Sequence, residues 1–102
     1  MPSQYLEAKD LPRITVYGED FRHEVAVMYN VVVDLNLWDW MKIEPPADQG
    51  YMFWDHPNVD RIINHPKVAA CGHSGATGSY CLRIVQKIIR VGLEQFKEEM
   101  TK

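Results

Sequence analysis

Three glycines at equal spacing form the segment of the sequence best suited to bind an anion. Gly72, Gly75 and Gly78 follow a strand-like run at 67–71 and precede a long stretch of helical periodicity. Glycines let a backbone approach a phosphate closely, and the first N–H groups of a helix favour negative charge. The pattern predicts a phosphate or nucleotide site formed by Gly72, His73, Ser74, Gly75, Thr77, Gly78, Ser79 and Arg83.

The same glycine segment resembles two known enzyme motifs. The Gly72-x-x-Gly75-x-x-Gly78 spacing resembles the variant dinucleotide fingerprint of nicotinamide enzymes with a Rossmann domain, which would also need a second parallel strand ending in an acid. The run from Gly72 to Ala76 is similar to the nucleophile elbow of serine hydrolases, but no histidine follows Ser74 as that family requires. We therefore predict a phosphate-containing ligand as an alternative function, and no catalytic residues.

Metal binding is a further chemical option for the region around the glycines. Four residues there are able to bind zinc: His65, Cys71, His73 and Cys81. Their spacing fits no common zinc pattern, and Cys81 falls on the apolar stripe of the predicted helix, as a core thiol would. We predict no metal and no cofactor, and interpret His56-Pro57 and His65-Pro66 as turn residues.

Aromatic side chains are concentrated in a 17-residue span that is also acidic. The span holds Trp38, Trp40, Tyr51, Phe53 and Trp54. Such residues either complete the core of a small domain or anchor a protein interface, where tryptophan and tyrosine are enriched. Both interpretations stay open at this point, and the five aromatics are our candidate partner-binding residues.

The charge of the chain is divided into two opposite blocks. The formal net charge is −3, which argues against a general nucleic-acid or acidic-membrane binder. Residues 34–60 include six acids and one base, whereas residues 61–93 include five bases and no acid. Arg83, Lys87 and Arg90 fall in one line of the predicted helix, either as a solvated face or as part of an anion site. The blocks can attract each other within one molecule or between subunits.

The elements that would position these residues are a small sheet and a long helix. Apolar residues at every odd position from Val25 to Leu37 predict a long strand, with a helix over 20–42 as the alternative. Apolar pairs at each turn predict a helix from Ser79 to Met100, with a stripe wide enough to meet either the rest of the chain or a partner subunit. Shorter predicted elements are strands at 13–17, 51–54 and 67–71, a turn at 18–20, and a helix at 58–64.

The predicted fold is one α+β domain over residues 1–102, with a small, mainly antiparallel sheet packed against the C-terminal helix. No apolar run is long enough for a membrane span and the N-terminus does not resemble a signal peptide, so we expect a cytoplasmic protein. We expect a non-enzymatic binding or regulatory protein that acts through protein contacts, as a homo-oligomer built on the C-terminal helix or a strand edge. Small acidic inhibitors of phages and mobile elements share this size and charge.

Overall fold

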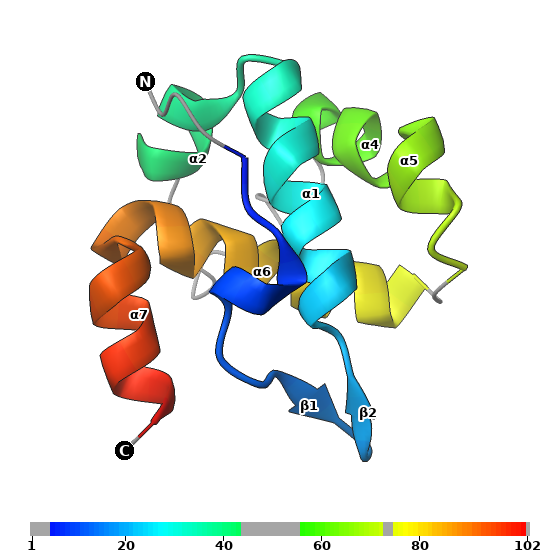
Figure 1. Ribbon diagram of the computed structural model, residues 1–102. Helices are drawn as coiled ribbons and strands as arrows, with labels where there is room; N and C mark the ends of the chain where they lie inside the picture. The colour runs from blue at the N-terminus through cyan, green and yellow to red at the C-terminus, as the bar shows by residue number, and fades with distance from the viewer. Residues whose placement is uncertain (1–4, 44–55, 73–74, 102) are drawn as a thin grey trace.

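The structure, a computed structural model, describes residues 5–43, 56–72 and 75–101, and these are mainly helical (Figure 1). Its elements in chain order are a 3-10 helix η1 (Ala8–Asp10), strands β1 (Thr15–Val16) and β2 (Glu19–Asp20), and helices α1 (Arg22–Asp34), α2 (Trp38–Ile43), α4 (Pro57–Ile63), α5 (Pro66–Ala69), α6 (Gly75–Val91) and α7 (Leu93–Met100). Helices α1 and α6 cross at the centre, and the hairpin β1–β2 projects from the start of α1 (Figure 1).

The predicted α+β fold with a small antiparallel sheet is wrong. Within the described ranges the only strand pairing is the hairpin, in which Thr15 pairs with Asp20 and Val16 with Glu19. The long strand predicted at 25–37 is helical instead and forms most of α1, and the strand predicted at 67–71 is replaced by α5. The strand predicted at 51–54 lies outside the described residues.

Helix α1 forms although its sequence alternates like a strand. Its buried residues are Val25, Ala26, Met28, Tyr29, Val31 and Val32, which follow the helical spacing of three and four. The alternation at odd positions was misleading because the even positions 26, 28 and 32 are apolar too. Since α1 packs against η1, α4, α5 and α6, burial on several sides outweighs the weak helix propensity of valine. The alternative helix over 20–42 is closer to the structure, although Asn36 interrupts it with a φ of 58°.

The C-terminal helix exists, but its start and its continuity differ from the prediction. It begins at Gly75 instead of Ser79, so Ser79 is not the N-cap. It also breaks at Gly92, whose φ of 90° is accessible mainly to glycine, and the chain continues as α7. Phe96 of α7 is 2% exposed, so this short helix packs against the core through the Phe96 side chain.

The wide apolar stripe of α6 is covered by the chain itself. Helix α6 packs against α1, α2 and α7. Its fully buried residues include Cys81, Leu82 and Val85, and Ile88 and Ile89 are nearly so. The chain itself therefore buries most of the stripe, and α6 is the central helix of the core; association through this helix stays a prediction.

Both His-Pro pairs begin helices. The N–H of Asn58 donates to His56 Nδ1 over 3.1 Å at the start of α4, and the N–H of Lys67 donates to His65 Nδ1 over 3.1 Å at the start of α5. Each proline occupies the first turn, where its missing N–H is harmless. The helix predicted at 58–64 is confirmed by α4.

Candidate functional site

The predicted phosphate site lies largely inside a helix. Residues His73 and Ser74 fall outside the described residues, and Gly75, Thr77, Gly78 and Ser79 belong to the first turns of α6. Gly72, with a φ of 74°, is the one described member that precedes the helix. Gly78 is buried, so its backbone does not face an open cradle. The phosphate ligand stays a prediction.

The basic line on α6 is engaged in contacts within the chain. Lys87 Nζ lies 3.0 Å from a Glu99 carboxylate oxygen of α7. Arg90 Nη1 donates to the carbonyl oxygen of Lys42 over 2.9 Å at the end of α2, where cations satisfy the last carbonyl groups of a helix. Arg83 is exposed one turn closer to the glycines. These contacts favour a structural role for Lys87 and Arg90.

The two tryptophans that the structure describes pack against the core. The rings of Trp38 and Tyr29 meet edge to face with centroids 5.8 Å apart, and those of Trp40 and His56 lie 4.8 Å apart. Both tryptophans are half-buried. The remaining predicted partner residues, Tyr51, Phe53 and Trp54, lie outside the described residues. Of the two interpretations, the arrangement of Trp38 and Trp40 favours the core.

The two cysteines are protonated thiols in the fold. Cys81 is fully buried, and burial, with Glu24 and Cys71 nearby, raises its pKa to about 12. Burial and Glu24 also raise the pKa of Cys71, whose Sγ donates to the carbonyl oxygen of Lys67 over 3.6 Å. Protonated thiols are poor nucleophiles and poor metal ligands. Among the described residues no group of three or more His, Cys, Asp and Glu side chains is placed to hold a metal ion.

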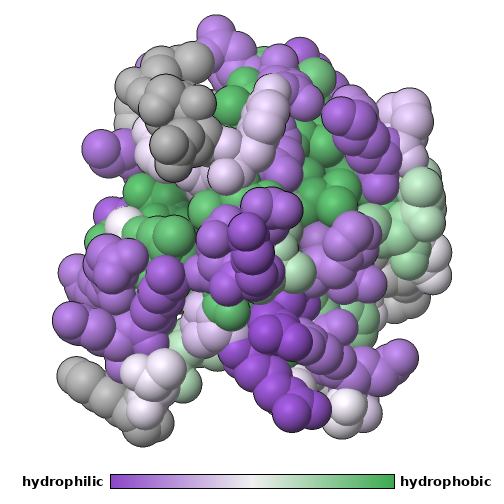
Figure 2. Space-filling view, viewed as in Figure 1, coloured by the Kyte–Doolittle hydropathy of each residue, from purple (hydrophilic) through white to green (hydrophobic). Residues whose placement is uncertain are grey.

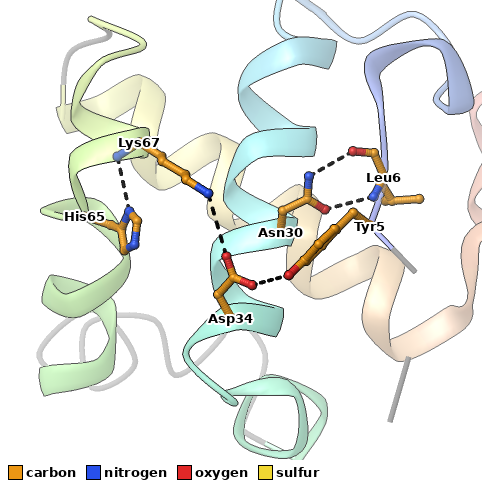
Figure 3. Close-up of polar contacts among 6 residues, drawn as sticks. All are labelled: Tyr5, Leu6, Asn30, Asp34, His65 and Lys67. Atoms are coloured by element: carbon orange, nitrogen blue, oxygen red, sulfur yellow. Dashed lines mark hydrogen bonds and ion pairs between the residues drawn. The ribbon is translucent and has the colours of Figure 1, made fainter. Parts of the chain in front are cut away.

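A polar clamp holds the N-terminal segment on α1 (Figure 3). The Asn30 side chain accepts from the Leu6 N–H over 2.8 Å and donates to the Leu6 carbonyl over 2.9 Å, as a neighbouring strand would. The Tyr5 hydroxyl donates to Asp34, and this hydrogen bond together with the negative charge raises the pKa of Tyr5. Lys67 Nζ of α5 lies 3.9 Å from the other oxygen of Asp34. This contact joins the acidic block to the basic block within one molecule.

The clamp leaves an open pocket between residues 6–9 and α1. Its volume is about 420 Å³. We call it the η1 pocket, and it is lined by Leu6, Glu7, Ala8, Lys9, His23, Ala26, Val27 and Asn30. We call its exposed lining residues Glu7, Lys9 and His23 the rim, whereas Ala26 in its lining is buried. The sequence gives no sign of this pocket, because it depends on the contact between Leu6 and Asn30, which lie 24 positions apart.

The hairpin presents a tyrosine at its tip. Tyr17 and Gly18 form a two-residue turn with φ angles of 52° and 82°, the signs of a type I′ turn. Asparagine or glycine is the usual first residue of such a turn, and a tyrosine in the left-handed region costs roughly 1–2 kcal/mol. The Tyr17 side chain is 100% exposed. In the isolated chain the backbone of Tyr17 is therefore strained, and its ring makes no packing contact that would offset this cost.

The base of the hairpin is fixed to the core. Ile14 is fully buried and Phe21 is 9% exposed, and the Phe21 N–H donates to the Ile14 carbonyl over 2.8 Å. Asp20 accepts from Arg22 Nε over 2.8 Å and lies 2.7 Å from its Nη2, so the guanidinium holds the pKa of that carboxyl below its usual range. The tip of the hairpin is therefore exposed, whereas its base is buried and hydrogen-bonded to the rest of the chain.

Tyr17 was not among the sequence-predicted partner residues. The available signal was the Tyr17-Gly18 pair between the short strands β1 and β2, in a turn where asparagine would fit the backbone better. In the described part of the chain no helix is long and apolar enough to cross a membrane. Comparisons with protein-family models, with curated proteins and with solved structures each found no match.

Proposed function

We propose that this is a non-enzymatic binding protein that docks onto a protein partner through the β1–β2 hairpin, with Tyr17 as the anchor. The observation that carries the proposal is the conformation of Tyr17, which is strained and fully exposed at once. Backbone strain that is not offset within a fold clusters at binding sites and switches.

Tyrosine is also suited to this role by its chemistry. It offers a large, rigid apolar area and a hydroxyl, and it is enriched among the residues that contribute most to interface affinity. The hairpin places the Tyr17 ring in solvent, away from the core. Core packing is not lost, because Ile14 and Phe21 bury the base of the hairpin. Because a tyrosine side chain has only two rotatable χ angles, fixing the exposed ring in a partner's pocket costs less entropy than fixing a longer side chain.

The proposal also includes the cellular compartment of the protein. Cys71 and Cys81 are free thiols, which suits a reducing compartment and supports a cytoplasmic location. A regulatory or inhibitory role, as in small acidic phage proteins, is consistent with a net charge of −3 but rests on likeness in size and charge alone.

Site-specific photocrosslinking tests the proposal. Tyr17 is replaced by benzoylphenylalanine, and in a matched control the same group replaces Glu94, whose side chain is 88% exposed on α7. Both variants are irradiated in the cells that produce the protein. We expect a discrete covalent adduct from position 17 that position 94 does not give, since only the tip is held inside a partner's pocket.

The adduct must also depend on the native surface. Excess unmodified protein should compete for the partner and reduce the adduct from position 17, whereas a Tyr17→Asn competitor should not. The same adducts from positions 17 and 94, or none from position 17, would contradict docking through the hairpin tip.

A further inference from the structure

We infer that the partner of the hairpin is a second copy of this chain, with Tyr17 of each copy seated in the η1 pocket of the other. This inference rests on the proposed function and names its partner. The pocket and the tip are independent features of the described structure, since one is formed by residues 6–9 with α1 and the other by β1 and β2.

The chemistry of the η1 pocket matches a tyrosine ring. Leu6, Ala26 and Val27 give it apolar walls, and His23 and Glu7 bring polar groups to its lining. A phenol needs the same combination, because its ring is apolar and its hydroxyl seeks a hydrogen-bond partner when it is buried. At about 420 Å³ the pocket falls within the range of roughly 300–1,000 Å³ that accepts small organic groups.

The geometry favours exchange between copies over contact within one chain. The hairpin leads directly into α1, whose first two turns carry His23 and Ala26 of the pocket. Tyr17 is nevertheless 100% exposed, so it makes no contact with its own pocket. Reciprocal seating of each tip in the other copy's pocket is a two-fold, self-complementary arrangement, the kind found in the commonest dimers.

Each of the two features includes an exposed acid and an exposed base, so every charge on one can meet an opposite charge on the other. The hairpin segment exposes the base Arg13 and the acid Glu19, while the rim of the pocket exposes Glu7 and Lys9. Glu7 and Lys9 lie 3.5 Å apart with side chains 71% and 76% exposed, a pair weak enough to exchange partners. In Figure 2 hydrophilic residues cover the lower part of the molecule, where Figure 1 places the hairpin. Such a rim around one aromatic anchor is typical of a reversible interface.

The expected interface is small. A buried tyrosine contributes roughly 150–250 Å², so two reciprocal contacts fall at the low end of protein interfaces, below about 1,200 Å². We therefore expect a weak dimer that forms and dissociates quickly, and that requires measurement over a wide range of protein concentration.

Sedimentation equilibrium between roughly 10 µM and 1 mM tests the inference, a range chosen for the weak affinity of small interfaces. Tyr17→Asn removes the anchor and keeps the pocket, whereas Ala8→Trp fills the pocket and keeps the anchor. Each variant alone should weaken dimerisation by at least about thirtyfold, the effect of losing a major anchor. If Ala8→Trp does not fold, Lys9→Glu replaces it, because that exposed side chain lies at the rim.

Mixing the two variants distinguishes this dimer from any other. One tip and one pocket remain intact in the mixed pair, so isotope-labelled Ala8→Trp should show amide shifts at Gly18 when unlabelled Tyr17→Asn is added. In the reverse labelling, shifts should appear at Val27 and Asn30. No such shifts from either labelling would overturn the tip-to-pocket contact.

The outcomes separate this inference from the proposed function. A strict monomer at every concentration, or a dimer that Tyr17→Asn leaves unchanged, would overturn the second copy as partner. In that case an adduct of position 17 with a different protein would still support the proposed function. Without any specific adduct from position 17, both proposals fail together.

Discussion

Helix α6 and the β1–β2 hairpin use large side chains in opposite ways. Along α6 the apolar side chains are buried against α1, α2 and α7, with Leu82 and Val85 fully removed from solvent. On the hairpin the largest side chain, Tyr17, is fully exposed and its backbone is strained. The arrangement of the helix is explained by the stability of the fold, whereas we attribute the exposed hairpin tip to the proposed contact with a partner.

The apolar residues that the sequence singles out do not lie on the hairpin that we propose as the binding surface. The wide stripe of α6 and the tryptophans of α2 attract attention in the sequence, yet the described structure packs both into the molecule. The clearest interface feature is instead a single residue whose placement opposes the preferences of its turn. The uncompensated backbone strain of Tyr17 therefore indicates the proposed interface better than hydrophobicity does.

The largest expected effect comes from the core. Leu82→Ala should lower the free energy of unfolding by about 2–5 kcal/mol, because it removes a fully buried side chain and leaves a cavity. Chemical denaturation followed by circular dichroism measures the change. Leu82→Met is the matched control and should cost less than about 1.5 kcal/mol, since it conserves volume. If Leu82→Ala lowered the free energy of unfolding by less than about 1 kcal/mol, the difference that we draw between the buried helix and the exposed hairpin would be wrong.

The clamp at Asn30 should have an intermediate effect. Asn30→Ala removes both hydrogen bonds to Leu6 and should cost about 1–3 kcal/mol, because the Leu6 N–H and carbonyl lose their partner in a partly buried site. Hydrogen exchange of the Leu6 amide should become much faster. Asp34→Asn leaves these two bonds in place and should keep that amide protected. Equal exchange in both variants would show that Asn30 does not hold the segment.

Alkaline pH should release the N-terminal segment with a smaller, local effect. The pKa of Tyr5 is raised above 10.0 by Asp34, so the contact stabilises the fold below pH 10 and is lost as the pH rises through the higher pKa of the folded state. Ultraviolet titration of the five tyrosines should show one that ionises at lower pH in Asp34→Asn. Identical titration curves would contradict the contact between Tyr5 and Asp34.

Only part of the helical content, α4 and most of the C-terminal helix, could be predicted from the sequence, because the signals for these helices are local. The apolar residues of 58–64 indicate α4, and the paired apolar positions after Gly78 indicate the body of α6, whereas the His-Pro pairs, interpreted as turn residues, begin α4 and α5. The break at Gly92 was missed because the apolar pattern continues across it through Leu93 and Phe96. A glycine inside a helical pattern reveals a turn only when its φ is known.

The strand predicted at 25–37 failed for a different reason. Valines at alternating positions fit a strand, and only the packing of α1 against several helices decides in favour of a helix. The sequence also does not show that residues 6–9 fold onto α1 through Asn30, because that contact spans 24 positions. The η1 pocket depends on this long-range contact, so sequence reasoning alone had no access to it.

The stability of Tyr17→Asn, measured by denaturation at low protein concentration where a weak dimer is not populated, tests the central claim most directly. Asparagine accepts the left-handed conformation, so the variant should be more stable than the original chain by roughly 1 kcal/mol. Tyr17→Phe, which keeps the strain and the ring, should leave the stability unchanged. A Tyr17→Asn variant that is less stable by about 1 kcal/mol or more would show that the fold depends on the tyrosine, and would contradict its assignment as an anchor for a partner.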